Sequence, residues 1–278
     1  MVSLNEREQA EKRRSSFEAS ETSRAATHLV RSPETVARYS APSGTTAFPL
    51  EYAFHLLGDV DGKTILEYGC GDGLNTAILA DRGAKVIALD ISDELLAIAR
   101  TRLEVNGCEG VDLLIGSAHA LPLQDESIDI IFGMAILHHL DLDLASRETW
   151  RVLKNGGRAI FEEPLRNSKL VDRVRKLFPV RADVSPFEHP LTEEQIEEFA
   201  ITGTRRARSF QLLLSSIAQT LPFWTRRAIK VSARIDSFLL RLFPSLAYYA
   251  TVKVFEMVKE EKPLIVVIPS FFLLSSAV

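Results

Sequence analysis

The residues best suited to chemistry lie between positions 67 and 90. Glu67 is followed at two-residue intervals by Gly69, Gly71 and Gly73, and Asp90 comes 17 residues after the last glycine. Glycine adopts positive φ angles readily and lets a ligand approach the backbone without interference from a Cβ atom. In dinucleotide-binding folds, an acid at the end of the next strand accepts hydrogen bonds from a ribose diol. The pattern therefore predicts a nucleoside site.

The spacing of the glycines narrows the kind of ligand. A pyrophosphate-binding loop has the pattern G-x-G-x-x-G, whereas this chain has G-x-G-x-G. The carboxylates of Glu67 and Asp72 would repel a pyrophosphate, but they suit a ligand that carries an ammonium group and no phosphate. A nicotinamide-dependent oxidoreductase is therefore disfavoured.

Short strands and helices alternate around this loop. Apolar runs predict strands, which fall at residues 64–68, 85–89, 111–115, 128–132, 157–161, 205–210 and 249–257. Helical patterns fall at residues 74–81, 93–105, 141–153 and 193–199, with one or two more helices within 211–247. Ser92 and Thr192 stand where helix N-caps are expected. Strands that alternate with helices predict an α/β fold with a mostly parallel sheet and helices on both faces.

Four segments in order resemble the class I S-adenosylmethionine-dependent methyltransferases that act on small molecules: ILEYGCGDG, VIALDIS, GSAHALPLQDESIDIIFGMAILHHL and LKNGGRAIFEEP. The resemblance covers roughly residues 60–163. It implies a Rossmann-like seven-stranded sheet with a helical cap, and S-adenosyl-L-methionine as the cofactor. A sulfonium is already an activated methyl donor, so such an enzyme mainly aligns the acceptor and excludes water.

The resemblance also implies which residues bind the cofactor: Tyr39, Glu67, Gly69, Cys70, Gly71, Gly73, Asp90, Ile91, Ser117, Ala118 and Met134. The glycine loop and Met134 would contact the methionine part, and Asp90 would contact the ribose. Ile91, Ser117 and Ala118 would lie beside the adenine. Tyr39 would belong to an amino-terminal lid.

Three residues are candidates for catalysis. His139, next to His138, follows the fourth strand and could accept a proton from a hydroxyl acceptor. Glu163 follows the fifth strand, where it either contacts the acceptor or caps a helix. His189 precedes a helix and either acts as a base or forms a structural hydrogen bond. We therefore expect O- or C-methylation ahead of N-methylation, with the base left open.

Composition limits the other functions. The 278 residues have a net charge of -4, which gives no general case for nucleic-acid binding. The two cysteines, without a Cys/His cluster, predict neither a disulfide scaffold nor a metal site. The amino terminus lacks a secretory signal, and no stretch reaches the ~18 to 20 apolar residues of a spanning helix. We expect a cytoplasmic protein, with peripheral membrane contact as an alternative.

Charge differs between the two parts of the chain. Residues 1–163 carry 16 basic and 26 acidic side chains, whereas residues 164–278 carry 17 and 11, a balance of +6. We divide the chain into an amino-terminal helical lid (1–58), a cofactor-binding core (59–163) and a third region (164–278) that contains an acceptor-side cap, the last strands of the sheet and an apolar tail. Apolar residues flanked by arginines in the cap suit either core packing or a membrane surface with a lipid-like acceptor. The apolar tail 263–278 could extend that surface, cover an apolar patch of the protein or pair two subunits.

Two alternatives to a small-molecule methyltransferase remain open on the sequence. A non-catalytic cofactor-binding or scaffold protein would keep the same loop and Asp90. A nucleic-acid methyltransferase would often carry an Asn/Asp-Pro-Pro-aromatic motif, which this sequence lacks. The predicted acceptor is therefore a small, hydrophobic molecule.

Overall fold

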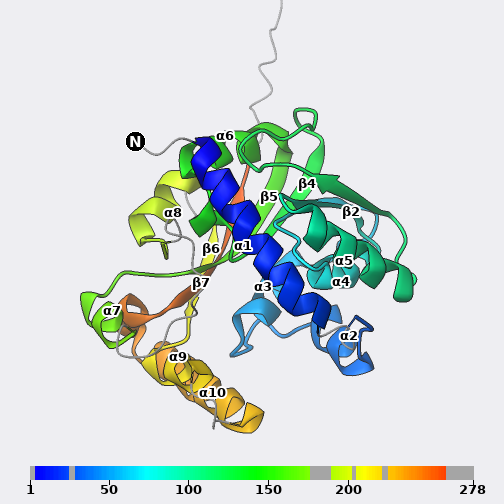
Figure 1. Ribbon diagram of the computed structural model, residues 1–278. Coiled ribbons are helices and arrows are strands. Elements are labelled where there is room, and N and C mark those ends of the chain that lie inside the picture. The colour runs from blue at the N-terminus through cyan, green and yellow to red at the C-terminus, as the bar shows by residue number, and fades with distance from the viewer. Residues whose placement is uncertain (1–3, 25–28, 176–188, 202–204, 221–224, 261–278) are drawn as a thin grey trace, which may run out of the picture.

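A seven-stranded sheet forms the centre of the molecule (Figure 1). The computed structural model describes residues 4–24, 29–175, 189–201, 205–220 and 225–260. The strands are β1 (Thr64–Tyr68), β2 (Lys85–Asp90), β3 (Val111–Ile115), β4 (Ile128–Met134), β5 (Leu153–Pro164), β6 (Arg206–Phe210) and β7 (Val252–Val258). Their order is β3-β2-β1-β4-β5-β7-β6, with β7 antiparallel to both neighbours. The predicted α/β fold class, with a mostly parallel sheet, is confirmed.

Helices cover both faces of the sheet. They are α1 (Leu4–Arg24), α2 (Pro33–Ser40), α3 (Pro49–Leu57), α4 (Leu74–Asp81), α5 (Asp93–Val105), α6 (Leu142–Val152), α7 (Lys169–Arg175), α8 (Glu193–Ala200), α9 (Leu213–Thr220) and α10 (Arg226–Leu242). The described residues also form the 3₁₀ segments η2 (Leu137–His139), between β4 and α6, and η3 (Pro244–Tyr249), between α10 and β7. Residues of α6 and α8 pack into one apolar cluster with the sheet, and residues of α3 and α4 pack into a second.

The expected helix caps are present. The Ser92 side chain accepts a hydrogen bond from the Leu95 amide and starts α5. Thr192 and Gln195 form a reciprocal capping box at the start of α8. These local signals fix where α5 and α8 begin, and Ser92 places the start of α5 directly after the end of β2.

The last strand differs from its predicted form. It begins at Val252, because the preceding residues to Tyr249 form η3. The alternation of apolar and polar residues predicted that only one face of this strand is buried, but the five central residues of β7 are all buried. The reason is its position between β5 and β6, where neighbouring elements cover both faces of the sheet.

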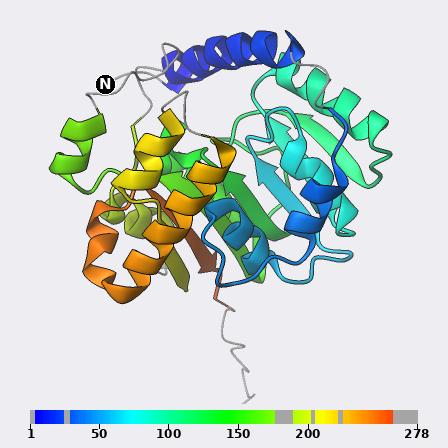
Figure 2. The ribbon, with the colours of Figure 1, turned by 90° about the horizontal axis from the view of Figure 1, so that it is seen from below.

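The first 58 residues divide into two parts. Helix α1 lies across the molecule as a separate layer (Figures 1 and 2), whereas α2 and α3 pack on the sheet. At the other end of the sheet, α9 and α10 lie side by side near β6. The tail 263–278 lies outside the described residues. No helix among the described residues is long and apolar enough to cross a bilayer.

Candidate active site

A cavity of about 320 Å³ lies where the carboxyl ends of four parallel strands meet. Its floor includes Gly69 after β1, Asp90 at the end of β2, Gly116 after β3 and Met134 at the end of β4. Helix α1 contributes the opposite wall. Ligands of open α/β sheets bind at this edge, so the cavity is the candidate active site.

The cavity brings together eight of the residues that the sequence singled out: Gly69, Gly71, Asp90, Ile91, Ser117, Ala118, Met134 and His139. The other six do not line it: Tyr39, Glu67, Cys70, Gly73, Glu163 and His189. Five of these six residues are buried inside the protein, and the sixth, His189, is exposed.

Asp90 links the glycine loop to the next strand end. Its Oδ2 accepts a hydrogen bond from the Gly71 amide at 2.8 Å, and its Oδ1 accepts one from the Ser92 amide at 2.9 Å. Burial raises the pKa of this carboxyl, and the two amide hydrogen bonds oppose that shift. Each carboxylate oxygen has a second lone pair, so Asp90 can still accept bonds from a diol in the cavity.

Glu67 lies beneath the loop and not in the cavity. Its side chain is 2% exposed and accepts a hydrogen bond from the Thr76 hydroxyl at 2.5 Å. Burial raises its pKa to about 8, and the nearby carboxylates Asp90 and Asp72 add to the shift. Asp72 itself points to Arg102, whose guanidinium lies 2.6 Å from its Oδ2. The sequence argument that Glu67 and Asp72 face the ligand is therefore not supported by their geometry.

Three of the predicted cofactor-binding residues are buried in the protein: Cys70, Gly73 and Tyr39. Burial raises the pKa of the Cys70 thiol far above its ordinary value, which leaves no reactive thiolate. Gly73 is the N-cap of α4. Tyr39 is buried with its ring 5.1 Å from that of Phe54, so it belongs to the sheet-facing core and not to a lid.

Glu163 caps η2, the 3₁₀ segment that follows β4. Its Oε1 accepts hydrogen bonds from the amides of Ile136 at 2.9 Å and Leu137 at 2.7 Å, and its side chain is fully buried. Its Oε2 lies 2.8 Å from Nδ1 of His138. Of the two roles that the sequence left open, the capping role is the one observed, because the carboxylate is directed into the protein.

His138 is the histidine that Glu163 orients. A carboxylate that accepts three hydrogen bonds favours an Nδ1–H tautomer on the imidazole, which places the basic lone pair on Nε2. His138 lines the cavity and its ring is 4.0 Å from that of His139. His189, by contrast, is exposed and outside the cavity.

Two acids of α1 hold the helix against the cavity rim. Glu8 accepts a hydrogen bond from the Ser117 hydroxyl at 2.6 Å and lies 3.2 Å from Nδ1 of His119. Glu11, one turn later, lies 3.2 Å from Nδ1 of His139. Burial alone would raise the pKa of each acid, but their hydrogen bonds to these partners lower it. The structure thus makes α1 a wall of the site. The sequence predicted an amino-terminal lid over residues 1–58, but it singled out none of the α1 residues that line the cavity.

The hydrogen bonds of His119 determine which of its ring nitrogens carries the proton. Its Nε2 accepts a hydrogen bond from the Asp141 amide at 2.9 Å, so Nδ1 carries the proton that faces Glu8. His119 therefore has both ring nitrogens in structural bonds. The cavity-lining residues of α1, at positions 7, 8, 11, 14, 15 and 18, share one face of the helix, but no sequence signal set that face apart from the solvated ones.

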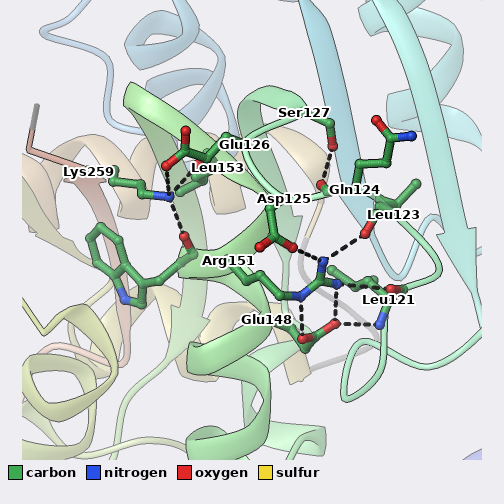
Figure 3. A network of polar contacts seen from close by, with 11 residues as sticks. Leu121, Leu123, Gln124, Asp125, Glu126, Ser127, Glu148, Arg151, Leu153 and Lys259 are labelled. Carbon is green, nitrogen blue, oxygen red and sulfur yellow. Dashed lines mark hydrogen bonds and ion pairs between the residues drawn. The ribbon is translucent and has the colours of Figure 1, made fainter. Parts of the chain in front are cut away.

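The segment between β3 and β4 is anchored outside the cavity by Arg151 (Figure 3). Its guanidinium donates to the Leu121 and Leu123 carbonyls and pairs with Glu148 through two nitrogens. Glu148 also accepts a bond from the Leu121 amide at 2.6 Å, and the bond from Arg151 lowers the Glu148 pKa. The segment that begins with Gly116 and Ser117 is therefore held at Leu121 and Leu123.

Similar proteins are known for the central part of this chain. Demethylmenaquinone methyltransferase of Lactococcus lactis subsp. lactis is 35% identical over 108 residues, which are 37% of this chain and 43% of that protein. Malonyl-(acyl-carrier protein) O-methyltransferase of Methylococcus capsulatus is 41% identical over 100 residues, which are 35% of this chain and 36% of that protein. The matched region thus spans less than half the length of either relative.

A solved structure shares the fold over a larger part. Geranyl diphosphate C-methyltransferase from Streptomyces coelicolor A3(2), in complex with Mg²⁺, geranyl diphosphate and S-adenosyl-L-homocysteine, has a TM-score of 0.54 and 16% identity, covering 75% of this chain and 77% of that chain. Residues 66–161 match the family model described as a methyltransferase domain. Residues 66–161 of this chain are therefore a methyltransferase domain. The resemblance seen in its sequence is confirmed.

The cavity of the methyltransferase domain fits S-adenosylmethionine in size and charge. Its volume lies within the ~300–1,000 Å³ of small-ligand pockets. Four carboxylates and two arginines line it: Asp90, Glu8, Glu11, Glu18, Arg7 and Arg14. This set suits a ligand with a sulfonium, an ammonium and one carboxylate better than a pyrophosphate. A Cβ at Gly71 would meet no atom within 4 Å, so the backbone there is open to a ligand.

Proposed function

We propose that this protein transfers a methyl group from S-adenosylmethionine to a small, hydrophobic acceptor, with O- or C-methylation favoured. The observation that carries the proposal is the cavity, in which the glycine loop, Asp90 and the strand-four end meet within a methyltransferase domain. The named relatives are a demethylmenaquinone methyltransferase and a malonyl-(acyl-carrier protein) O-methyltransferase, which supports methyl transfer to carbon or oxygen of a metabolite. The cofactor supplies the activated methyl, and the chain supplies alignment and exclusion of water.

The proposed cofactor contacts follow the residues that line the cavity. Asp90 would accept bonds from the ribose hydroxyls, and Ile91 and Ala118 would flank the adenine. Gly69 and Gly71 would lie under the methionine part. Glu67 would act indirectly through the loop that it supports. We retain no contact for Tyr39.

The proposed base for a hydroxyl acceptor is the His138–His139 pair, with His138 as its main member. His138 lines the cavity and Glu163 fixes its ring, so Glu163 is a positioning residue. His139 lies against Glu11 of α1 and would help to close the site. His189 is exposed and lies outside the cavity, so the proposed base does not include it.

The test is methyl transfer from isotope-labelled S-adenosylmethionine to a panel of lipophilic phenols, acids and quinones. With an accepted phenol, His138→Ala should lower kcat at least about a hundredfold, the low end of the ~10²–10⁴ range of general-base effects, and leave cofactor affinity unchanged. His189→Ala serves as the matched control and should keep full turnover. Normal turnover in His138→Ala would remove the base assignment. Cofactor binding without transfer to any acceptor would favour a non-catalytic binding or scaffold protein.

We also propose that the protein meets lipophilic acceptors as a peripheral partner of a membrane surface. Two features support this: residues 164–278 carry a balance of +6, and several large apolar side chains of α10 and η3 are exposed. The same exposed residues could instead pair two subunits, which the experiment below separates.

A further inference from the structure

Helix α10 presents large apolar residues outward. Phe238 is 63% exposed and Leu242 is 56% exposed, and Val231 and Ile235 are also exposed. These four residues are spaced at three and four positions, so they form one ridge along the helix. Phe243 and Tyr248 continue exposed apolar surface beyond the end of α10. A helix that only packs on its own protein would turn such a ridge inward.

The inward face of α10 is instead small and polar. Ser232, Ala233 and Asp236 are buried. Asp236 Oδ2 accepts hydrogen bonds from the amides of Leu212 and Ser215, both at 3.0 Å, which fixes the start of α9. The orientation of α10 is therefore set by specific polar contacts, and the apolar ridge is left in solvent as a consequence.

A row of cations runs beside the ridge. Arg227, Lys230, Arg234 and Arg241 are exposed at the same helical spacing, and the only acid within α10 is the buried Asp236. The apolar ridge and the cationic row thus lie next to each other on one helix. This combination is typical of helices that lie in a membrane interface.

Three of these cations face a groove. Lys230, Arg234 and Arg241 line a groove of about 780 Å³ between α10 and the α2–α3 segment. The two acids of the groove are Glu34 and Glu51, and Glu51 is already paired with the Arg38 guanidinium at 2.5 Å. The α10 side of the groove therefore carries excess positive charge, which complements lipid phosphate groups.

We propose that the outward face of α10 docks on an anionic lipid bilayer. The ridge of Val231, Ile235, Phe238 and Leu242 enters the boundary between headgroups and acyl chains, and the cationic row contacts the lipid phosphates. This inference specifies the surface for the peripheral membrane contact proposed above, and it rests on that proposal. A second copy of the chain would also cover the ridge, but its own α10 offers no row of acids to complement the cationic row, whereas an anionic bilayer offers a phosphate surface.

The experiment is co-sedimentation of the full chain with two kinds of vesicle. One is made of phosphatidylcholine alone, and the other contains about 30% phosphatidylglycerol, which makes its surface anionic. We expect binding to the anionic vesicles only, weakened when sodium chloride is raised from about 0.1 M to about 0.5 M. The double variant Lys230→Gln/Arg234→Gln should bind about thirtyfold more weakly, from about 1 kcal/mol for each cation. The matched control Lys85→Gln/Arg100→Gln removes two exposed charges near the β3 edge of the sheet and should bind normally.

The apolar ridge has its own variant. Phe238→Ser/Leu242→Ser should abolish most vesicle binding, whereas Val105→Ser, which changes an exposed apolar residue on α5, should not. Equal binding of the α10 variants and the native chain would overturn the proposal, as would binding to phosphatidylcholine alone. A dimer in lipid-free buffer that Phe238→Ser dissociates would overturn it in favour of a subunit interface. Titration of every variant with S-adenosyl-L-homocysteine should be unchanged, which separates failure of docking from failure of the methyltransferase proposal.

Discussion

At the scale of single residues, the glycines of the loop have two different tasks. Gly71 has φ +54° and lines the cavity, with open space where a Cβ would stand. Gly73 has φ +79°, and a Cβ there would lie 2.8 Å from the Cβ and 3.0 Å from the Cα of Ala99 on α5. The first glycine admits a ligand, and the second admits a neighbouring helix.

Alanine substitutions should separate these two tasks. Both variants force alanine into the left-handed region, at about 1–2 kcal/mol each. Gly73→Ala should lose at least about 1 kcal/mol more, because it must also displace α5. Gly71→Ala should bind S-adenosyl-L-homocysteine at least tenfold more weakly, because its new methyl group enters ligand space. Urea unfolding and calorimetric titration measure the two effects. Equal stability loss in both variants would contradict the packing role of Gly73.

At the scale of elements, the segment between β3 and β4 is held at two points. Ser117 contacts Glu8 of α1 near its start, and Arg151 of α6 holds the backbone of Leu121 and Leu123 near its middle. The partners of Arg151 differ in environment. Glu148 is mostly buried, whereas the Asp125 side chain is 74% exposed. The two ion pairs should therefore differ in their effect on stability.

Removing each partner of Arg151 in turn tests this difference. Glu148→Ala leaves the Leu121 amide without its acceptor and should cost about 1–3 kcal/mol of unfolding free energy. Asp125→Ala removes only an exposed pair and should cost at most about 1 kcal/mol. Thermal or urea unfolding of both variants gives the comparison. A larger loss of unfolding free energy in Asp125→Ala would show that the exposed ion pair of Arg151 with Asp125, and not its pair with Glu148, anchors the segment.

At the scale of the whole molecule, the buried acid Glu67 makes stability depend on pH. Its folded pKa of about 8 lies above the ordinary value of 4.5, so the folded state holds a proton that the unfolded state releases. Stability from this group is therefore fully present at acidic pH and falls as pH rises from about 4.5 to about 8.

Glu67→Gln should remove this dependence. Between pH 5.5 and 8.5, the native chain should lose about 2–3 kcal/mol of unfolding free energy more than the variant. Urea unfolding at both pH values provides the measurement. The variant also controls for other titrating groups, including Glu162, whose pKa is raised to about 8 by burial in the same way. Parallel pH profiles would mean that Glu67 is ionised in the folded protein.

The sequence predicts local features of this molecule better than contacts between distant parts. Strand and helix positions follow from apolar periodicity and caps such as Ser92 and Thr192, and the positions of Gly71 and Asp90 follow from one strand–loop–helix unit. The direction of Glu163 depends on backbone amides 26 to 27 residues away, and the contact of Glu8 with Ser117 spans 109 residues. No periodicity encodes such contacts, so α1 looks like an ordinary solvated helix until the fold places it.

The most direct test of the central claim is calorimetric titration of the purified chain with S-adenosyl-L-homocysteine, with NAD as the control ligand. We predict binding of the homocysteine compound and no binding of NAD. Asp90→Ala should weaken that binding by about 1–3 kcal/mol, whereas Asp112→Ala, an exposed acid on β3, should leave it unchanged. Unchanged affinity in Asp90→Ala, or equal binding of NAD, would contradict the assignment of the cavity.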